Sequence, residues 1–166
     1  MPPLRCWNVL SWNVKDLNSE KKQLALNNAI ISSGCAVVYL QETKMPDVSF
    51  AFIKTCFPKQ FNRFAFVHSR GASGGLLTVW KSALFTDTIV FADVFVLTIN
   101  FVSTQSSQSW SLVNIYGPCT GDDREVFTTW LYDVQIPNGQ DWLLVGDFNY
   151  IFIPTNRNNL VETLMI

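Results

Sequence analysis

Four short polar motifs stand where strand-like segments of this sequence end. At each one an amide, a carboxylate or a phenol follows a run of apolar residues. A rigid sheet gathers distant residues at its rim in this way, and many enzymes carry their chemistry there. These residue types predict divalent-metal binding and phosphate hydrolysis. The motifs are Ser11-Trp12-Asn13-Val14, Gln41-Glu42-Thr43-Lys44, Asn114-Ile115-Tyr116-Gly117-Pro118 and Gly146-Asp147-Phe148-Asn149.

Asp147 and Asn149 lie two residues apart, just beyond the apolar run Trp142–Val145. If this segment stays extended, both side chains emerge on the same side of the chain. The carboxylate can then orient or deprotonate a water molecule while the amide holds a phosphoryl oxygen, and attack on a phosphodiester needs both functions. The alternative is an Asx turn, in which the two side chains only satisfy backbone donors.

Glu42 directly follows the continuous apolar run Ala36–Leu40. A carboxylate at the end of a buried strand is costly unless it is solvated or paired, and Mg²⁺ would satisfy it. The alternative is an exposed side chain paired with Lys44. Asn13 ends the first predicted strand, where its amide could bond Glu42 or a bound phosphate, or serve only as a turn residue.

Tyr116 precedes Gly117-Pro118, a turn that fixes the backbone direction and so aims the phenol. An aimed phenol can donate to a phosphate oxygen, although an ordinary half-buried strand tyrosine gives the same sequence. His68 is the single histidine and stands at a predicted hairpin mouth, which is more typical of a surface position than of a catalyst. The segment Gly71–Gly75 lacks the Lys-Ser/Thr pair of a phosphate-binding P-loop and is interpreted as a turn.

The segments between the motifs predict an α/β domain in which helices pack over sheet. Continuous apolar runs predict two strands that are buried on both faces, and alternating segments predict two hairpins. The doubly buried strands are 36–40 and 142–145, and the hairpins are 64–68 with 76–80 and 90–101 with 110–116.

Helices are expected near the N-terminus, over 45–58 and over 122–134. The first begins after an N-cap at Asn18 or Ser19 and ends before Gly34, which suits a helix C-terminus. Its apolar residues recur near helical spacing; they are Leu24, Ile30 and Ile31.

The composition describes one domain with a large core. Of the 166 residues, 48% are hydrophobic and 15% are charged. The formal net charge of −1 lacks the overall basic character of a non-specific nucleic-acid binder. No apolar run reaches bilayer length and no signal-peptide core is present, so we expect an intracellular protein, nuclear or cytoplasmic, with no membrane partner. Free thiols are then expected at Cys6, Cys35, Cys56 and Cys119.

The order of the motifs resembles that of the endonuclease/exonuclease/phosphatase superfamily, which includes apurinic/apyrimidinic endonucleases and deoxyribonuclease I. The segments that carry this resemblance read Ser-Trp-Asn-Val, Gln-Glu-Thr-Lys, Ser-Gly-Gly-Leu-Leu, Asn-Ile-Tyr-Gly-Pro and Leu-Leu-Val-Gly-Asp-Phe-Asn. The sequence is most similar to the endonuclease domain of plant LINE-type (non-LTR) retrotransposons, in which an Asn-Arg-Asn stretch follows, as it does at 156–158. The resemblance extends from about Leu4 to Asn158.

This resemblance implies a mixed β-sandwich flanked by helices, with Mg²⁺ or Mn²⁺ at the sheet rim, and a DNA-nicking endonuclease as the activity. It implies that Glu42 is the metal ligand and that Asn13 is its neighbour in the metal and phosphate shell. Tyr116 then contacts the phosphate. Asp147 orients or deprotonates the attacking water, and Asn149 positions it.

The sequence departs from the family pattern after these motifs. Family members continue into a second half that ends in Ser-Asp-His, and His68 precedes Tyr116, which is the wrong order for that histidine. We therefore expect 1–159 to be the N-terminal part of the domain, incomplete at its C-terminus, and 160–166 to be an aberrant tail.

Such a chain is expected to have a crippled activity and weak or lost DNA binding. Uncovered sheet edges would favour self-association. Two other functions stay open: a phosphatase or phosphodiesterase of the same superfamily, and a non-catalytic truncated remnant.

Overall fold

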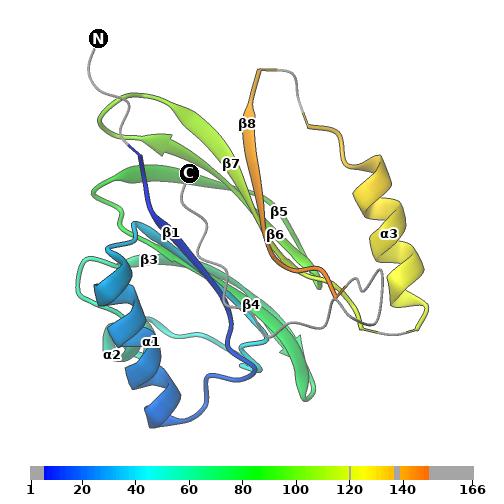
Figure 1. Cartoon of the computed structure of the whole chain (residues 1–166), viewed down its shortest axis with the longest axis horizontal. Coiled ribbons are helices and arrows are strands. Elements are labelled where there is room, and N and C mark those ends of the chain that lie inside the picture. The colour runs from blue at the N-terminus through cyan, green and yellow to red at the C-terminus, as the bar shows by residue number, and fades with distance from the viewer. Residues whose placement is uncertain (1–5, 120, 137–138, 150–166) are drawn as a thin grey trace.

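A computed structural model describes residues 6–119, 121–136 and 139–149 and shows a sandwich of two four-stranded mixed sheets (Figure 1). The first sheet has the order β1-β2-β4-β3 and the second the order β5-β6-β7-β8. The first sheet consists of β1 (Val9–Asn13), β2 (Val37–Gln41), β3 (Arg63–Arg70) and β4 (Ser73–Trp80). The second consists of β5 (Phe85–Asp93), β6 (Val96–Ser103), β7 (Ser109–Tyr116) and β8 (Asp141–Asp147).

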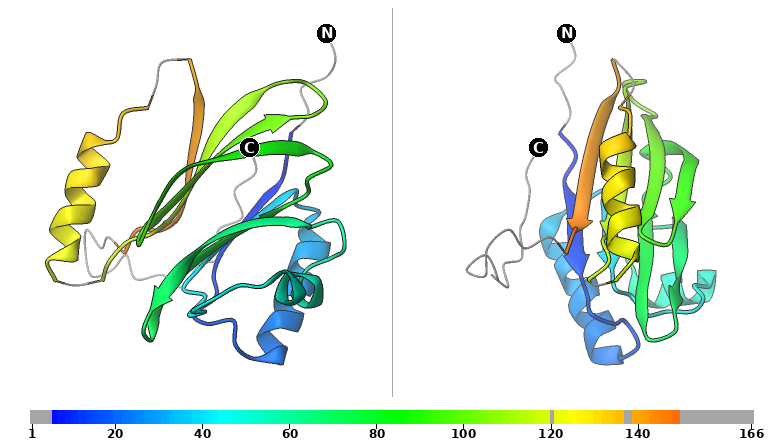
Figure 2. Two further views of the ribbon diagram at one scale, coloured as in Figure 1. Left: turned by 180° about the vertical axis from the view of Figure 1, so that it is seen from behind. Right: turned by 90° about the vertical axis from the view of Figure 1, so that its right-hand side faces the viewer.

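Helices cover both outer faces of the sandwich, as the sequence predicts. The helices α1 (Glu20–Ser33) and α2 (Phe50–Cys56) lie on the first sheet, and α3 (Asp123–Asp133) lies on the second (Figures 1 and 2). Three apolar clusters fill the spaces between these layers, and the middle cluster contains the inward-facing residues of both sheets. The α/β fold class and the helix-flanked mixed sandwich are therefore confirmed.

Each sheet contains one parallel pair of strands. β1 pairs with β2, and β7 pairs with β8, while the other pairings are antiparallel. Strands β1 and β8 belong to different sheets but contact each other. The carboxyl ends of both parallel pairs consequently meet at one end of the sandwich, which is where the polar motifs of the sequence fall.

The limits of α1 follow the sequence signals, and one of its three apolar residues at helical spacing is buried. The Ser19 hydroxyl caps the helix by accepting from the Lys22 backbone N–H, and Gly34 closes it in the left-handed conformation with φ 61°. The residues that α1 buries are Leu26 and Ile30, whereas Leu24 and Ile31 are each 63% exposed. Of the three apolar residues at helical spacing, Ile30 therefore packs against the sheet, one turn after Leu26.

The segment 90–101, predicted as one strand of a hairpin, is the end of β5, a turn and most of β6. The turn has neither glycine nor proline to mark it. Instead, the Asp93 carboxylate accepts from the backbone N–H of the next residue, Val94, at 2.6 Å. A β-bulge between Ile89 and Phe91 further obscures the alternation of β5.

The two strands predicted to be buried on both faces behave differently. Every residue of β2 is buried, as expected. In β8, by contrast, Trp142, Leu143 and Leu144 are partly exposed, because β8 has β7 as its only neighbour within the described residues. The helix expected over 45–58 is shorter than predicted and occupies only α2.

All four cysteines are free thiols, as expected. In the described ranges, no helix is long and apolar enough to cross a membrane. The expected boundary between 159 and 160 lies outside the described residues.

Candidate active site

The ends of four strands bring two carboxylates, one amide and one phenol from the rims of the two sheets into one hydrogen-bonded group. Asn13 ends β1, Glu42 directly follows β2, Tyr116 ends β7 and Asp147 ends β8. The Asn13 Nδ2 atom donates to Asp147 Oδ2 at 2.9 Å and to Glu42 Oε1 at 3.3 Å. A single amide thus bridges two carboxylates that are carried by different sheets.

The orientation of the Asn13 amide is fixed from its other side. Its Oδ1 atom accepts from the Lys15 backbone N–H at 3.1 Å, so the amide nitrogen is the atom that faces the carboxylates. The predicted bond between Asn13 and Glu42 is present. The alternative partner considered for Glu42 was Lys44, and the hydrogen bonds of the Glu42 carboxylate come instead from Asn13 and Tyr116.

The Tyr116 hydroxyl donates to Glu42 Oε1 at 2.9 Å. The phenol is 9% exposed, and this burial raises its pKa well above the ordinary tyrosine value. The hydrogen bond to the Glu42 carboxylate acts in the same direction, because it favours the neutral phenol. Tyr116 is therefore a protonated donor, and Glu42 Oε1 accepts two hydrogen bonds.

Asn149 does not continue the extended chain, so the predicted same-side arrangement with Asp147 is wrong. Asn149 adopts a left-handed conformation with φ 51°, which folds its backbone N–H toward Asp147 Oδ1 at 2.9 Å. Its side-chain Nδ2 donates to the Gly117 carbonyl at 2.5 Å. This is the Asx turn that the sequence left as the alternative, and it fixes the Asp147 carboxylate from a second direction.

Gly117 lets the strand ends approach closely enough for these bonds. Its backbone N–H donates to the Asp147 carbonyl at 2.7 Å. A Cβ atom at Gly117 would lie 2.3 Å from the Phe148 carbonyl oxygen, a distance that side chains cannot tolerate. Gly75 plays a similar part in the first sheet, where a Cβ would lie 2.4 Å from Thr43 Oγ1 in the turn after Glu42.

Strained backbone conformations gather around the same group. Among the described residues, six that are not glycine have positive φ, and five of these lie in the turns that follow β1, β2 and β8. Such conformations persist only where the surrounding structure enforces them, and they concentrate at functional sites. The five are Lys15, Asp16, Glu42, Lys44 and Asn149.

The donor set fits a hard divalent cation. Glu42 and Asp147 offer carboxylate oxygens, and Glu42 uses only Oε1 in the hydrogen bonds of the described residues. In that part of the chain, no group of three or more His, Cys, Asp or Glu residues could hold a metal. Two carboxylates fit a hard divalent cation that keeps several water ligands.

Lysines border the group on the side of the first sheet. Lys15 is exposed and Lys44 partly exposed. Lys22 Nζ lies 2.5 Å from Asp16 Oδ2, and this hydrogen bond holds the pKa of Asp16 below its ordinary value. Of these cations, only Lys44 was considered from the sequence, as a possible partner of Glu42, because their spacing carries no signal until the turns after β1 and β2 come together.

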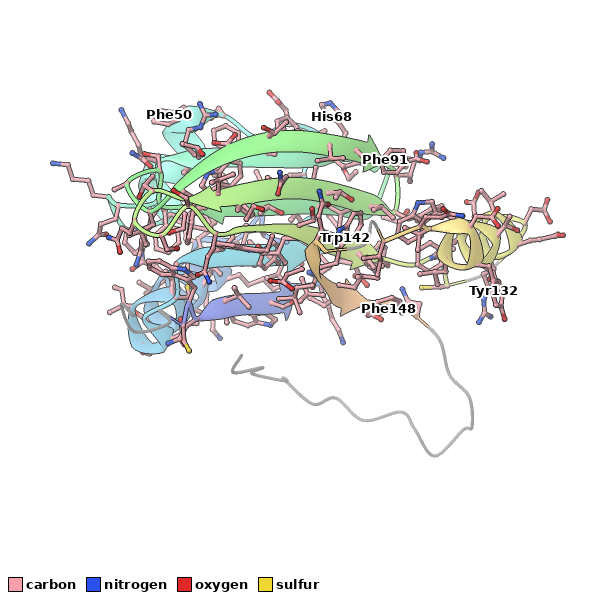
Figure 3. The ribbon with its side chains drawn as sticks, turned by 90° about the horizontal axis from the view of Figure 1, so that it is seen from above. Phe50, His68, Phe91, Tyr132, Trp142 and Phe148 are labelled. Atoms are coloured by element: carbon pink, nitrogen blue, oxygen red, sulfur yellow. The ribbon has the colours of Figure 1, made fainter. Side chains whose placement is uncertain are left out.

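His68 stands apart from the group. Its Nδ1 atom lies 2.6 Å from the Pro46 carbonyl oxygen, and its ring packs edge-on against Phe66. Figure 3 shows His68 on the opposite side of the sandwich from Phe148, which follows Asp147. Cys119, which sequence analysis did not consider for the site, is close: its Sγ lies 4.0 Å from the Tyr116 hydroxyl. The only feature of the sequence that could have indicated this proximity is that Cys119 follows Tyr116 by three residues.

Solved structures share this fold. An apurinic/apyrimidinic endonuclease from Leishmania major is 24% identical with a TM-score of 0.53, and covers 81% of this chain and 46% of its own. The endonuclease domain of TRAS1, a telomere-specific non-LTR retrotransposon, is 13% identical with a TM-score of 0.65, and covers 89% of this chain and 63% of its own. A mannosyl-6-phosphatase from Bacteroides thetaiotaomicron is 11% identical with a TM-score of 0.59, and the match covers 86% of this chain and 65% of the phosphatase.

At these identities the likeness establishes the fold, which is of the endonuclease/exonuclease/phosphatase type. The chain spans about half to two thirds of the length of the solved structures it matches. No family model matches the sequence. No curated protein matches it either.

Proposed function

We propose that this chain is a divalent-metal-dependent phosphodiester hydrolase that nicks DNA, derived from the endonuclease of a LINE-type non-LTR retrotransposon of plants. The observation that carries the proposal is the Asn13 amide, which holds the Glu42 and Asp147 carboxylates together from two sheets. Two like charges brought together at one partly buried rim are favourably accompanied by a cation. The fold supports the same conclusion, since metal-dependent nucleases share it.

Glu42 and Asp147 would hold the Mg²⁺ or Mn²⁺ ion. When bound, the ion supplies positive charge that offsets the charge developing on the phosphoryl group. Asn13 keeps the two carboxylates at a fixed separation, because its nitrogen donates to both. The left-handed backbone at Glu42, with φ 52°, turns this side chain back over the sheet rim.

Asp147 is the group that would orient the attacking water and accept its proton. Its two oxygens accept from Asn13 and from the Asn149 backbone, so the carboxylate cannot rotate away from the rim. Tyr116 would donate to a phosphate oxygen, and to do so its hydroxyl must exchange Glu42 for the substrate. The Asn149 amide nitrogen is held by Gly117, so in this geometry Asn149 contributes by fixing the turn after Asp147.

DNA is favoured as the substrate by the lysines beside the rim. Lys15 and Lys44 lie in the turns that follow β1 and β2 and would contact phosphates that flank a scissile bond, while the formal net charge of −1 favours weak binding overall. The activity of this polypeptide is expected to be low. Within the described residues no imidazole stands at the rim, and losing one member of a group that acts together removes most of the rate.

Two alternatives follow from the same geometry. The carboxylate pair would equally serve a phosphatase or another phosphodiesterase, and it could also persist in a remnant that no longer turns over. A substrate panel of a phosphomonoester, a phospholipid and duplex DNA distinguishes a DNA-nicking enzyme from a phosphatase or another phosphodiesterase. Magnesium titration by calorimetry distinguishes an enzyme from a non-catalytic remnant, because a remnant without an ordered Glu42 site gives no saturable heat.

The direct test is a nicking assay with supercoiled plasmid, the purified 166-residue chain and Mg²⁺ or Mn²⁺. We expect slow formation of relaxed circles that Glu42→Ala abolishes and that Glu20→Ala, an exposed change in the first turn of α1, leaves unchanged. Equal nicking by the wild type and Glu42→Ala would refute the assigned site. No nicking by a folded wild type that still binds the metal would favour the remnant.

A further inference from the structure

Two buried amides form a bridge between the sheets directly beneath the candidate site. Gln41 is 1% exposed and Asn114 is fully buried, at 0%. The Gln41 Nε2 atom donates to Asn114 Oδ1 at 2.7 Å, which joins β2 of the first sheet to β7 of the second. The neighbouring inward-facing side chains on these strands, Tyr39 and Leu112, belong to the apolar cluster between the sheets. The amide pair is therefore a polar link in an apolar interface.

Further hydrogen bonds extend the link to two more strands. The remaining donors of both amides are used within the first sheet, and none reaches the rim. Gln41 Nε2 donates to Ser11 Oγ at 3.3 Å, and Asn114 Nδ2 donates to Leu40 O at 3.3 Å, Leu77 O at 3.4 Å and Thr78 Oγ1 at 3.3 Å.

The Gln41–Asn114 hydrogen bond is adjacent to the Tyr116–Glu42 hydrogen bond, which joins the two sheets at the candidate site. Gln41 immediately precedes Glu42, and Asn114 stands two residues before Tyr116, on the same face of β7. Any slip of β7 along β2 would have to break the Gln41–Asn114 bond. The same slip would move the Tyr116 hydroxyl away from Glu42 Oε1, from which it is now 2.9 Å.

We propose that Gln41 and Asn114 are positioning residues for the candidate site, and that they set the offset between the sheets at which Tyr116 meets Glu42. Their meaning for catalysis rests on the proposed function, but their effect on the Tyr116–Glu42 contact does not. Neither side chain touches the rim, since both are buried, so neither can act on a substrate directly.

Stability and positioning can be separated by substitution. Replacing one amide by leucine leaves the other buried without its partner across the sheets, which costs about 1–3 kcal/mol. Replacing both by leucine removes both amides together and is expected to be less destabilising than the sum of the single changes, because no amide is left without its cross-sheet partner, although Thr78 Oγ1 still loses a hydrogen bond. Exchanging the two residues, as Gln41→Asn with Asn114→Gln, keeps the combined length of the pair and can restore the bond.

The experiment compares Asn114→Leu, the Gln41→Leu/Asn114→Leu pair and the exchanged pair with the wild type. Thr98→Val, a buried change in β6, serves as the matched control. The first readout is the ring spectrum of ¹³C-labelled tyrosine, in which Tyr116 is assigned by its loss in Tyr116→Phe. The second is Mn²⁺ affinity by electron paramagnetic resonance, and thermal melts confirm that each variant is folded.

We expect both leucine variants to shift the Tyr116 resonance and to raise the Mn²⁺ Kd about 10- to 100-fold, the usual effect of losing a residue that supports a ligand. The exchanged pair and Thr98→Val should keep the wild-type resonance and Kd. If the Gln41→Leu/Asn114→Leu variant is stable and keeps the wild-type Tyr116 resonance and Mn²⁺ Kd, the proposal is overturned, because the two amides would then serve packing alone. If the wild type binds no Mn²⁺ but the Tyr116 resonance still moves in the leucine pair, the proposed function fails and the positioning role stands.

Discussion

Asn13 and Asp147 are separated by 134 positions in the chain, and a 2.9 Å hydrogen bond joins the Asn13 Nδ2 atom to Asp147 Oδ2. This bond connects the first strand of one sheet to the last described strand of the other. The candidate site is consequently a property of the interface between the sheets, and changes that move one sheet against the other should disturb it more than they disturb either sheet alone.

Removing the charge of Asp147 should lower the nicking rate strongly. Asp147→Asn keeps the size and one acceptor oxygen but cannot accept a proton from water, so we expect a loss of about 100-fold or more. The initial rate on supercoiled plasmid measures it. Asp141→Asn, an exposed change at the other end of β8, is the control and should keep the wild-type rate. Equal losses in both variants would contradict the role given to Asp147.

Glu42→Gln should weaken metal binding without unfolding the protein. The amide can still accept from Asn13 and Tyr116, but it lacks the charge that attracts Mg²⁺. We expect the Kd for Mn²⁺, measured by calorimetry, to rise about 10-fold or more. Glu125→Gln, an exposed change in the first turn of α3, should have no effect. An unchanged Kd in Glu42→Gln would place the metal elsewhere.

Gly117→Ala should both destabilise the protein and misplace Asp147. The new Cβ would lie 2.3 Å from the Phe148 carbonyl oxygen, so the turn after β8 must move. We expect a loss of about 1–3 kcal/mol in the free energy of unfolding by urea, the usual cost of overpacking. Gly71→Ala has open space around its Cβ and only backbone strain, so it should lose less stability and keep the metal affinity that Gly117→Ala loses.

The buried Cys56 should make the protein less stable at high pH. Burial raises the pKa of Cys56 from 9.0 to about 11. As the pH rises through this range, the unfolded chain loses the thiol proton before the folded chain does, so the free energy of unfolding falls. Urea unfolding at pH 8 and pH 10 should show a smaller decrease for Cys56→Ala than for the wild type. At pH 8, thiol reagents should modify the exposed Cys6 and Cys119 first.

The apolar edge strand β5 should drive self-association. Ile89, Val90 and Phe91 are 53%, 55% and 42% exposed, and β5 is an edge of its sheet in the described residues. A charge on an edge strand opposes pairing with another copy. Phe91→Lys should therefore increase the monomer fraction in sedimentation velocity, while Tyr132→Lys on α3 should not (Figure 3). A wild type that stays monomeric at high concentration would contradict this expectation.

Local signals in the sequence predicted much of the fold. The Ser19 cap, the Gly34 terminus and the continuous apolar run before Glu42 each act over a few residues, so the limits of α1 and the burial of β2 could be read directly. The turn at Asp93 was missed because it uses a side-chain hydrogen bond in place of glycine. The partial exposure of β8 depends on which strands surround it, which its own residues do not encode.

The membership of the site was predictable, but its connections were not. Asn13, Tyr116 and Asp147 each end a strand and Glu42 directly follows one, and the structure brings the four together. The bonds between them depend on the offset between two sheets and on left-handed turns such as that at Asn149. The Gln41–Asn114 bridge belongs to the same class, since a pair of amides 73 residues apart gives no local signal.

The positions of β1 and β8, the first and last strands in the described part of the chain, have a consequence for the order of events during synthesis. Asn13 and Glu42 leave the ribosome long before Asp147 exists, so the nascent chain holds one carboxylate of the pair with no partner. Contacts between such distant residues close slowly, because the intervening chain must first be ordered. The pair that would bind the ion therefore forms only when translation has passed β8, and ion binding would report that the whole sandwich has assembled.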